Sequence, residues 1–250
     1  MNWFLNPENS QEVNNAFANL DNTFAIQGEQ ITQDPLSRVL KVKIGTSYFY
    51  VKRYHQAGKH LRRFAGPSRI KTEWRNLLFF KQLGIPTIPI VAYGEERQYG
   101  IFKRGAMISE ELTNTIDLKT LAEQQSELLK SSAWCSKVIN QVAQYTRLLH
   151  QHQFVHNDLK WRNILVTPTT QPAVYFIDCP AGSFWPGWLL TPFRNYRMIK
   201  DLACLDKVAK YQLRRTQRLA FYKAYRNRKT LTGDDKKQIH KILNFFNNRE

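Results

Sequence analysis

The residues with the clearest chemical pattern lie in the middle of the chain, where Asp158 and Asn163 stand five positions apart after His156. A carboxylate can accept the proton of an attacking hydroxyl group, and an amide oxygen can bind a hard cation such as Mg²⁺. The spacing H-x-D-x-x-x-x-N before an apolar run is typical of a phosphoryl-transfer loop. Lys160 would then meet the γ-phosphate as a point charge, and His156 would brace the loop. A plain polar loop between a helix and a strand is the alternative.

A second carboxylate, Asp178, comes fifteen residues after Asn163, at the end of the apolar run 173–177. Residues 167–172 are typical of a hairpin turn, so the hairpin would bring Asp178 to the same edge as Asp158. We therefore predict Asn163 and Asp178 as the Mg²⁺ ligands. Taken alone, an aspartate followed by Cys-Pro instead of Phe-Gly fits a turn equally well.

Lys52 lies in a run of aromatic and β-branched residues, which is an unusual place for an unpaired lysine. Glu73 is the one acidic residue between positions 56 and 94, and it falls on a predicted helix. Lys52 would bind the α- and β-phosphates of ATP, and Glu73 would hold the lysine in place. An edge-strand lysine with a surface glutamate is the alternative, and Arg53 or Lys43 could take the part of Lys52.

The glycine-rich motif that would cover the phosphates of ATP is missing. None of the ten residues after Gly28 is glycine. Backbone N–H groups would have to bind the phosphates there, helped by Thr32, Ser37 or Arg38.

The elements that must position these residues change in type along the chain. Before residue 110, the pattern predicts a helix, three strands, a long helix and two strands, over 10–20, 24–31, 39–44, 48–54, 68–83, 88–93 and 99–108. After it, the pattern predicts a long helix, a hairpin of two apolar runs and three helices, over 132–151, 164–166, 173–177, 198–211, 216–225 and 234–246.

We therefore predict an α+β, two-lobed fold of the protein-kinase type. The N-lobe, residues 1–109, would be a small antiparallel sheet with one main helix, and the C-lobe, residues 110–250, would be mainly helical. Backbone groups of Glu110 and Leu112 would hold the adenine, by analogy of fold alone.

The formal net charge of +17 gathers in two zones, with +7 over residues 51–75 and +11 over residues 191–250. Such zones face an anionic partner or simply solvent, and the candidates are ATP, nucleic acid, anionic lipid headgroups and a phosphorylated saccharide. The three scattered cysteines argue against a disulfide framework and a structural zinc site. Without a signal-peptide pattern or an uninterrupted apolar span, we expect a soluble, cytoplasmic protein.

With these motifs in place, the chain resembles the lipopolysaccharide kinase family (Kdo/WaaP/InaA-like) of Gram-negative bacteria, over about residues 48–246. The likeness rests on five segments, 48–54, 73–77, 156–165, 176–180 and 200–203. It implies phosphorylation of a sugar of the lipopolysaccharide inner core, heptose or Kdo, with ATP and Mg²⁺. It also implies that Asp201 starts a helix that braces the catalytic loop.

The segment between Asp178 and Asp201 has only 22 residues and no Ala-Pro-Glu anchor for a peptide substrate. The aromatic side chains of this segment, Phe184, Trp185, Trp188 and Phe193, would suit sugar rings or acyl chains. Its arginines, Arg194 and Arg197, would suit phosphates. The alternative is that the aromatic side chains are part of the core.

The basic C-terminal helices could lie against the anionic inner leaflet, where a lipid-linked saccharide acceptor would be met. Their cations are Arg214, Arg215, Arg218, Lys223, Arg226, Arg228 and Lys229. We expect no nucleic acid partner, because no recognition motif accompanies the charge.

Two rival functions remain. One is an atypical kinase for a protein or small molecule, as in RIO-like kinases or aminoglycoside phosphotransferases, and the short segment after Asp178 counts against it. The other is a non-catalytic regulatory protein with the same fold, against which the five intact site residues count: Lys52, Glu73, Asp158, Asn163 and Asp178.

Overall fold

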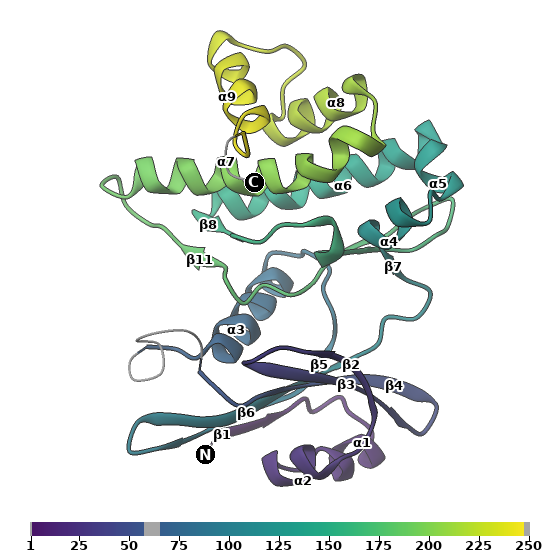
Figure 1. The fold of residues 1–250 in the computed structure, drawn as a ribbon, viewed down its shortest axis with the longest axis vertical. Coiled ribbons are helices and arrows are strands. Elements are labelled where there is room, and N and C mark those ends of the chain that lie inside the picture. Colours follow the sequence, from purple (N-terminus) through teal and green to yellow (C-terminus); the bar gives the residue numbers. More distant parts are fainter. Residues whose placement is uncertain (1, 58–65, 248–250) are drawn as a thin grey trace. The chain divides into compact units, whose positions relative to one another are not determined.

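The computed structural model describes residues 2–57 and 66–247, and its contacts divide the chain into two compact units (Figure 1). Unit 1 comprises residues 1–79 and 87–113, and unit 2 comprises residues 80–86 and 114–250. The functional lobe boundary between residues 109 and 110 stays a sequence-based prediction.

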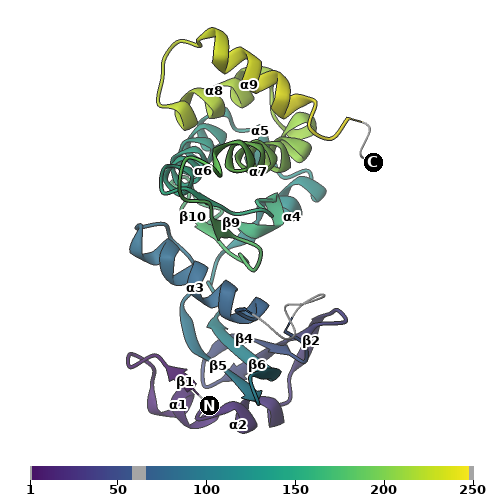
Figure 2. The same cartoon turned by 90° about the vertical axis from the view of Figure 1, so that its left-hand side faces the viewer.

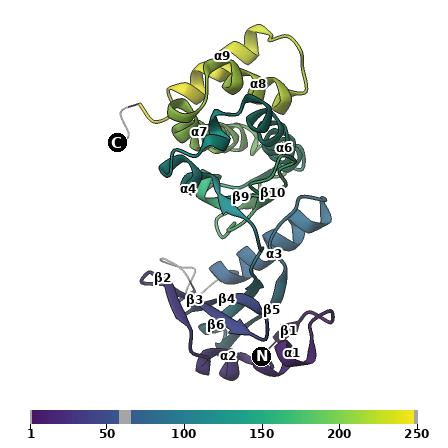
Figure 3. The same cartoon turned by 90° about the vertical axis from the view of Figure 1, so that its right-hand side faces the viewer.

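Unit 1 is built on a six-stranded antiparallel sheet in the order β1-β5-β6-β4-β3-β2. Its strands are β1 (Asn2–Leu5), β2 (Glu29–Gln33), β3 (Ser37–Ile44), β4 (Ser47–Tyr54), β5 (Ile90–Gln98) and β6 (Ile101–Glu110). The helices are α1 (Gln11–Ala16), α2 (Leu20–Ala25) and α3 (Arg69–Gln82). As Figures 2 and 3 show, α1 and α2 lie along one face of the sheet and α3 along the other.

Successive side chains of β4 point to opposite faces of the sheet, so the two faces have different surroundings. Phe49 and Val51 point into an apolar core that also contains Phe17, which directly follows α1, and Leu20, the first residue of α2. Lys52 therefore points to the opposite face, toward α3.

The N-terminal region differs from the prediction. In place of one helix over 10–20 there are two short helices, each with a polar N-cap, Ser10 for α1 and Asn19 for α2. The predicted strand over 24–31 is wrong in its first half, because Phe24 belongs to α2 and β2 begins only at Glu29. Strand β1 was not predicted, since four residues at a sheet edge carry too little periodicity.

Unit 2 is mainly helical, with α4 (Leu118–Glu123), α5 (Glu127–Lys130), α6 (Ser132–Gln151), α7 (Thr191–Gln212), α8 (Arg215–Arg226) and α9 (Gly233–Leu243). Its short strands are β7 (Ile116–Asp117), β8 (Phe154–Val155), β9 (Ile164–Val166), β10 (Val174–Phe176) and β11 (Ser183–Phe184). They form the sheets β10-β9-β7 and β11-β8. The helices α6, α7, α8 and α9 share one core that includes Ala143, Leu202, Tyr222 and Ile242.

Helix α7 begins at Thr191, with Pro192 in its first turn. The prediction that Asp201 starts a helix is therefore wrong, because Asp201 lies in the middle of α7, where it is fully buried. Among the described residues, no helix is both long enough and apolar enough to cross a membrane.

Candidate functional site

In unit 1, Lys52 and Glu73 form an ion pair. Lys52 Nζ lies 2.7 Å from Glu73 Oε1 and 3.0 Å from Oε2, and the Glu73 side chain is fully buried. The hydroxyl group of Tyr54, two residues along the same face of β4, donates to Glu73 Oε2 at 3.0 Å. Glu73 is therefore a buried anchor instead of a surface glutamate, and it fixes the direction of the lysine.

The two other cations considered for this part are engaged elsewhere. Arg53 points to the opposite face of β4, where its guanidinium donates to the Ile26 carbonyl. Burial lowers the pKa of Arg53. Lys43 lies 5.8 Å from the ring of Tyr48. Lys52 is thus the cation that Glu73 holds.

The turn between β2 and β3 is closed by a carboxylate. Asp34 Oδ1 accepts hydrogen bonds from the backbone N–H groups of Leu36 at 2.7 Å and Ser37 at 2.8 Å, and the Ser37 hydroxyl donates to Oδ2 at 3.2 Å. Burial raises the pKa of Asp34, but these hydrogen bonds outweigh it and hold the pKa below its usual value. Two N–H groups of the stretch that was expected to bind phosphate, those of Leu36 and Ser37, are therefore occupied by Asp34.

Of the two residues predicted to bind adenine, Glu110 is the last residue of β6 and Leu112 follows two positions later. The backbone N–H of Glu110 donates to the Pro89 carbonyl at 3.0 Å, so this N–H is already used within unit 1. The neighbouring Glu111, which the sequence did not single out, accepts from Lys41 at 2.7 Å and from the Tyr50 hydroxyl at 2.9 Å. Roles of Glu110 and Leu112 in binding adenine stay predictions.

In unit 2, Asp158 is surrounded by cations. Its Oδ1 lies 2.5 Å from Lys160 Nζ, and its Oδ2 lies 3.6 Å from the Arg162 guanidinium. Burial raises the pKa of Asp158, but the hydrogen bond and charge of Lys160, with Arg162, outweigh it, and the pKa lies below its usual value. Asp158 is thus an ionised carboxylate that can accept a proton.

The side-chain amide of Asn163 closes the same loop. Its Nδ2 donates to the Asp158 carbonyl oxygen at 2.8 Å, which leaves Oδ1 as the atom that can bind a cation. Across the hairpin, the Ile177 N–H donates to the Asn163 carbonyl at 3.0 Å. The hairpin therefore holds Asn163 beside the backbone that leads directly into Asp178, whose φ of +53° marks a sharp turn.

The donor set at this hairpin suits Mg²⁺. An amide oxygen and a carboxylate are hard ligands, and Mg²⁺ commonly takes one or two protein oxygens and completes its shell with phosphates and water. Among the described residues there is no cluster of three or more His, Cys, Asp and Glu side chains that could hold a metal ion alone.

The loop is braced from α7 and from its own core. The backbone N–H of His156 donates to Asp201 Oδ2 at 2.7 Å. The His156 ring is fully buried beside Phe80 and Phe176, and neither ring nitrogen has a hydrogen-bond partner in the described part of the chain. Burial lowers the pKa of His156, so the ring is a neutral packing group.

A further contact to the loop, absent from the sequence-based prediction, runs through Asn157. This residue has a φ of +64°, and its Nδ2 donates to the Ala181 carbonyl at 2.9 Å. Its Oδ1 accepts from Arg197 at 2.8 Å, and the Arg197 guanidinium lies over the ring of Trp185, 4.5 Å from its centroid. Of the aromatic residues predicted to meet the acceptor, Trp185 thus supports the loop, whereas Trp188 is 81% exposed.

Comparison with known proteins gives three findings. The profile of the lipopolysaccharide kinase (Kdo/WaaP) family matches residues 35–225. A 3-deoxy-D-manno-octulosonic acid kinase of Actinobacillus succinogenes is 31% identical over 125 residues, which are 47% of this chain and 49% of that protein. The match thus spans about half the length of that relative. A solved structure of WaaP in complex with acyl carrier protein is 19% identical and superposes with a TM-score of 0.73 over 98% of both chains. This likeness confirms the predicted α+β, two-lobed, kinase-like fold.

Proposed function

The chain belongs to the lipopolysaccharide kinase (Kdo/WaaP) family, and from this premise we propose that it is an ATP-dependent kinase for a sugar of the lipopolysaccharide inner core, heptose or Kdo. The observation that carries the proposal is the ionised Asp158, held 2.5 Å from Lys160 and joined to Asn163 through the loop. A sugar kinase needs such a base next to a cation for the transferred phosphate. The similarity to a Kdo kinase, over about half the length of that protein, supports a sugar as the acceptor.

In the proposed reaction, the acceptor hydroxyl gives its proton to Asp158. Its oxygen forms a bond to the γ-phosphorus while the bond between that phosphorus and the β–γ bridging oxygen breaks, and ADP leaves. Lys160 neutralises charge on the γ-phosphate, and Lys52, fixed by Glu73, does so on the α- and β-phosphates. Asn163 and Asp178 would hold Mg²⁺, which neutralises the phosphate oxygens when bound.

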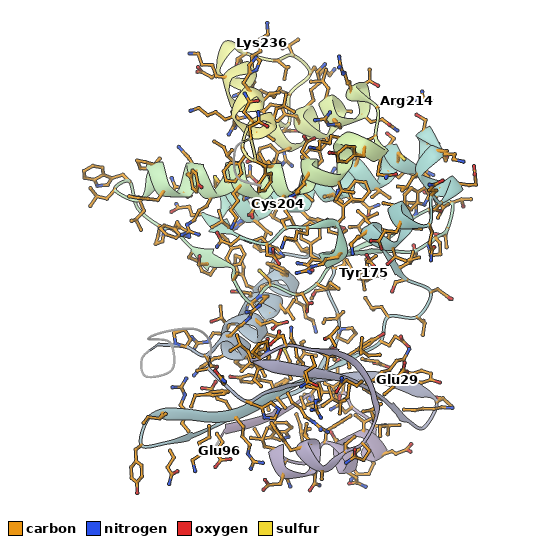
Figure 4. The ribbon with its side chains drawn as sticks, viewed as in Figure 1. Glu29, Glu96, Tyr175, Cys204, Arg214 and Lys236 are labelled. Carbon is orange, nitrogen blue, oxygen red and sulfur yellow. The ribbon has the colours of Figure 1, made fainter. Side chains whose placement is uncertain are left out.

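We also propose contact between α8 and an anionic surface at the cytoplasmic face of the inner membrane. Part of the predicted basic face is used internally, because Arg218 pairs with Asp206 at 2.6 Å, and both Arg226 and Arg228 pair with Asp235. The remaining exposed cations include Arg214, which projects from the surface as Lys236 of α9 does (Figure 4). Nearby cations each favour an anionic membrane by about 1 kcal/mol.

A protein partner is the second proposal. The structural neighbour was solved with an acyl carrier protein, and unit 2 of this chain contains an apolar cavity of about 490 Å³. Its walls include Val138, Leu205, Leu219 and Ile242, with Arg215 and Arg218 beside them. Such a cavity suits the acyl chain of a carrier protein, and Arg214 and Arg215 would favour a partner with an anionic surface.

The deciding experiment offers the purified chain labelled ATP, Mg²⁺ and truncated lipopolysaccharides of defined core length. We expect transfer to begin once one particular inner-core sugar is present, and to disappear in Asp158→Asn. Transfer to protein or to a small molecule alone would establish the atypical-kinase alternative. If ATP with Mg²⁺ causes no thermal shift and no transfer occurs, the chain is a regulatory protein instead.

A further inference from the structure

The segment 184–196, which leads from β11 into α7, exposes an unusual amount of apolar surface. Among the described residues, six of the thirteen exposed large apolar side chains lie here: Phe184, Trp188, Leu189, Leu190, Phe193 and Tyr196. Trp188 is 81% exposed and Leu189 is 68% exposed. Apolar side chains scattered singly need no explanation, but a concentrated patch of this kind marks an interaction site.

The segment is held in a defined shape. The Arg194 guanidinium donates to the carbonyl groups of Trp185 at 2.9 Å and Gly187 at 3.4 Å, and to Gln153 Oε1 at 3.1 Å. Gly187 has a φ of +84°, which allows the tight turn before α7. The exposed side chains are thus presented by an ordered turn at the start of α7, the left end of that helix in Figure 1.

The charge of the segment points to the chemistry of the partner. Arg194, Arg197 and Lys200 lie in a stretch with no acidic residue between Asp178 and Asp201. None of the three cations pairs with a carboxylate within the described ranges; the Arg197 partners are the Asn157 amide oxygen and the Trp185 ring. Surfaces that enter the headgroup region of an anionic bilayer typically combine exposed aromatic and aliphatic side chains with cations that no carboxylate neutralises.

We propose that residues 184–196 dock the chain on an anionic lipid bilayer. Trp188 and Leu189 enter the boundary between headgroups and acyl chains, while the positive charges of Arg194 and Lys200 attract lipid phosphates. A sugar-binding platform would use the aromatic side chains of the segment but would leave Leu189 and Leu190 without a role, because a leucine side chain has neither an aromatic face nor a polar group for a saccharide.

The position of the segment next to the catalytic loop suggests what docking would do for the reaction, and this step rests on the proposed function. Strand β11 pairs directly with β8, where Phe184 faces Phe154 and Ser183 faces Val155. Residues 156–163 of the catalytic loop follow immediately. Docking through this segment would therefore hold the loop at the membrane surface, where a lipid-linked sugar is presented.

The test measures binding of the full chain to vesicles of neutral phosphatidylcholine, with and without phosphatidylglycerol, by sedimentation. We expect binding to the anionic vesicles and about tenfold weaker partition for Leu189→Gln, with a larger loss for Leu189→Gln/Leu190→Gln. Ile101→Gln, which changes a 43% exposed aliphatic residue of β6, is the matched control and should stay within about twofold of wild type.

The proposal would be overturned if the wild-type chain bound neither kind of vesicle. It would also be overturned if the leucine variants bound anionic vesicles as strongly as wild type. A variant that keeps vesicle binding but loses self-association in light scattering would overturn it as well, because the patch would then join two copies. Phosphoryl transfer to a delipidated core oligosaccharide should be unchanged in Leu189→Gln, and a raised KM would assign the segment to the acceptor instead. Vesicle binding without any transfer by wild type would contradict the proposed function alone.

Discussion

At the scale of single residues, the state of Asp158 is decided by a competition. Burial disfavours the charged carboxylate, and Lys160 at 2.5 Å together with Arg162 outweighs this effect. The folded pKa therefore lies below the unfolded value of about 4. It follows that the ion pair stabilises the fold above that pH and that this contribution is lost as the pH falls through the folded pKa.

We predict that Lys160→Gln moves the acidic limb of the pH profile of kcat/KM to higher pH, because burial of Asp158 is then opposed only by the more distant Arg162. The position of the limb, measured from the shape of the profile, is independent of any loss in absolute rate. Arg162→Gln is the control and should move the limb less, since its nitrogen lies 3.6 Å from the carboxylate. An acidic limb that stays in place in Lys160→Gln would mean that another group sets it.

At the scale of elements, α7 supports the catalytic loop at two points. Asp201 accepts the backbone N–H of His156, and Arg197 donates to Asn157, so two adjacent loop residues are fixed from one helix. The Arg197 contact fixes the side chain of a residue with a φ of +64°, a conformation that asparagine adopts more readily than most other non-glycine residues.

We predict that Arg197→Met lowers kcat with a soluble acceptor by about 10- to 100-fold, since small shifts of a catalytic carboxylate are costly. ATP affinity, measured by calorimetry, should be unchanged, because Arg197 reaches Asn157 and not the nucleotide. Lys200→Met is the matched control, as it removes the same charge from α7 without a contact to Asn157. Equal kcat values for the two variants would show that Arg197 acts by charge alone.

The sequence was a good guide to the elements with strong periodicity. The α6 bounds Ser132–Gln151 and the β9 bounds Ile164–Val166 agree with those predicted, because both have clear apolar patterns and clear stops. The start of helix α7 was predicted seven residues too late, since its first turns carry exposed Phe193 and Tyr196 in place of an apolar stripe facing a core.

The candidate site could be predicted in part, because some of its residues belong to motifs with a clear spacing. Motif spacing indicated Lys52, Glu73, Asp158 and Asn163, and the first two are paired in unit 1 while the last two share a loop in unit 2. The Asn157–Arg197 contact could not be predicted, because it joins residues forty positions apart, Asn157 is an unspecified position of the catalytic-loop motif and Arg197 belongs to no motif. The hydrogen bonds of Asp34 to the backbone of its turn could not be predicted as a feature of the site either, since an aspartate before a proline is typical of any turn.

At the scale of the whole molecule, the two units have separate buried ionic anchors. Glu73 is the buried partner in unit 1, and Asp201 is the buried acceptor in unit 2. Removing the charge of either leaves its partners poorly satisfied inside one unit only.

We therefore predict that Glu73→Gln raises amide hydrogen exchange in β4 and in its neighbours β3 and β6, and leaves α6 and β9 protected as in wild type. Asp201→Asn should do the reverse, with faster exchange at residues 154–157. The two variants serve as controls for each other, and both are read by mass spectrometry of peptides. Faster exchange throughout the chain in either variant would show that the units unfold together.

The three cysteines, Cys135, Cys179 and Cys204, are all buried, and all belong to unit 2. Burial raises the pKa of Cys135 and raises that of Cys204 to about 11, so the native thiols should react slowly with alkylating reagents. Thiol labelling of the unmodified chain is therefore a built-in probe of unit 2 opening. Tyr99 of unit 1 is 94% exposed, so a fluorophore on Tyr99→Cys would be attached selectively and would report on the other unit in the same experiment.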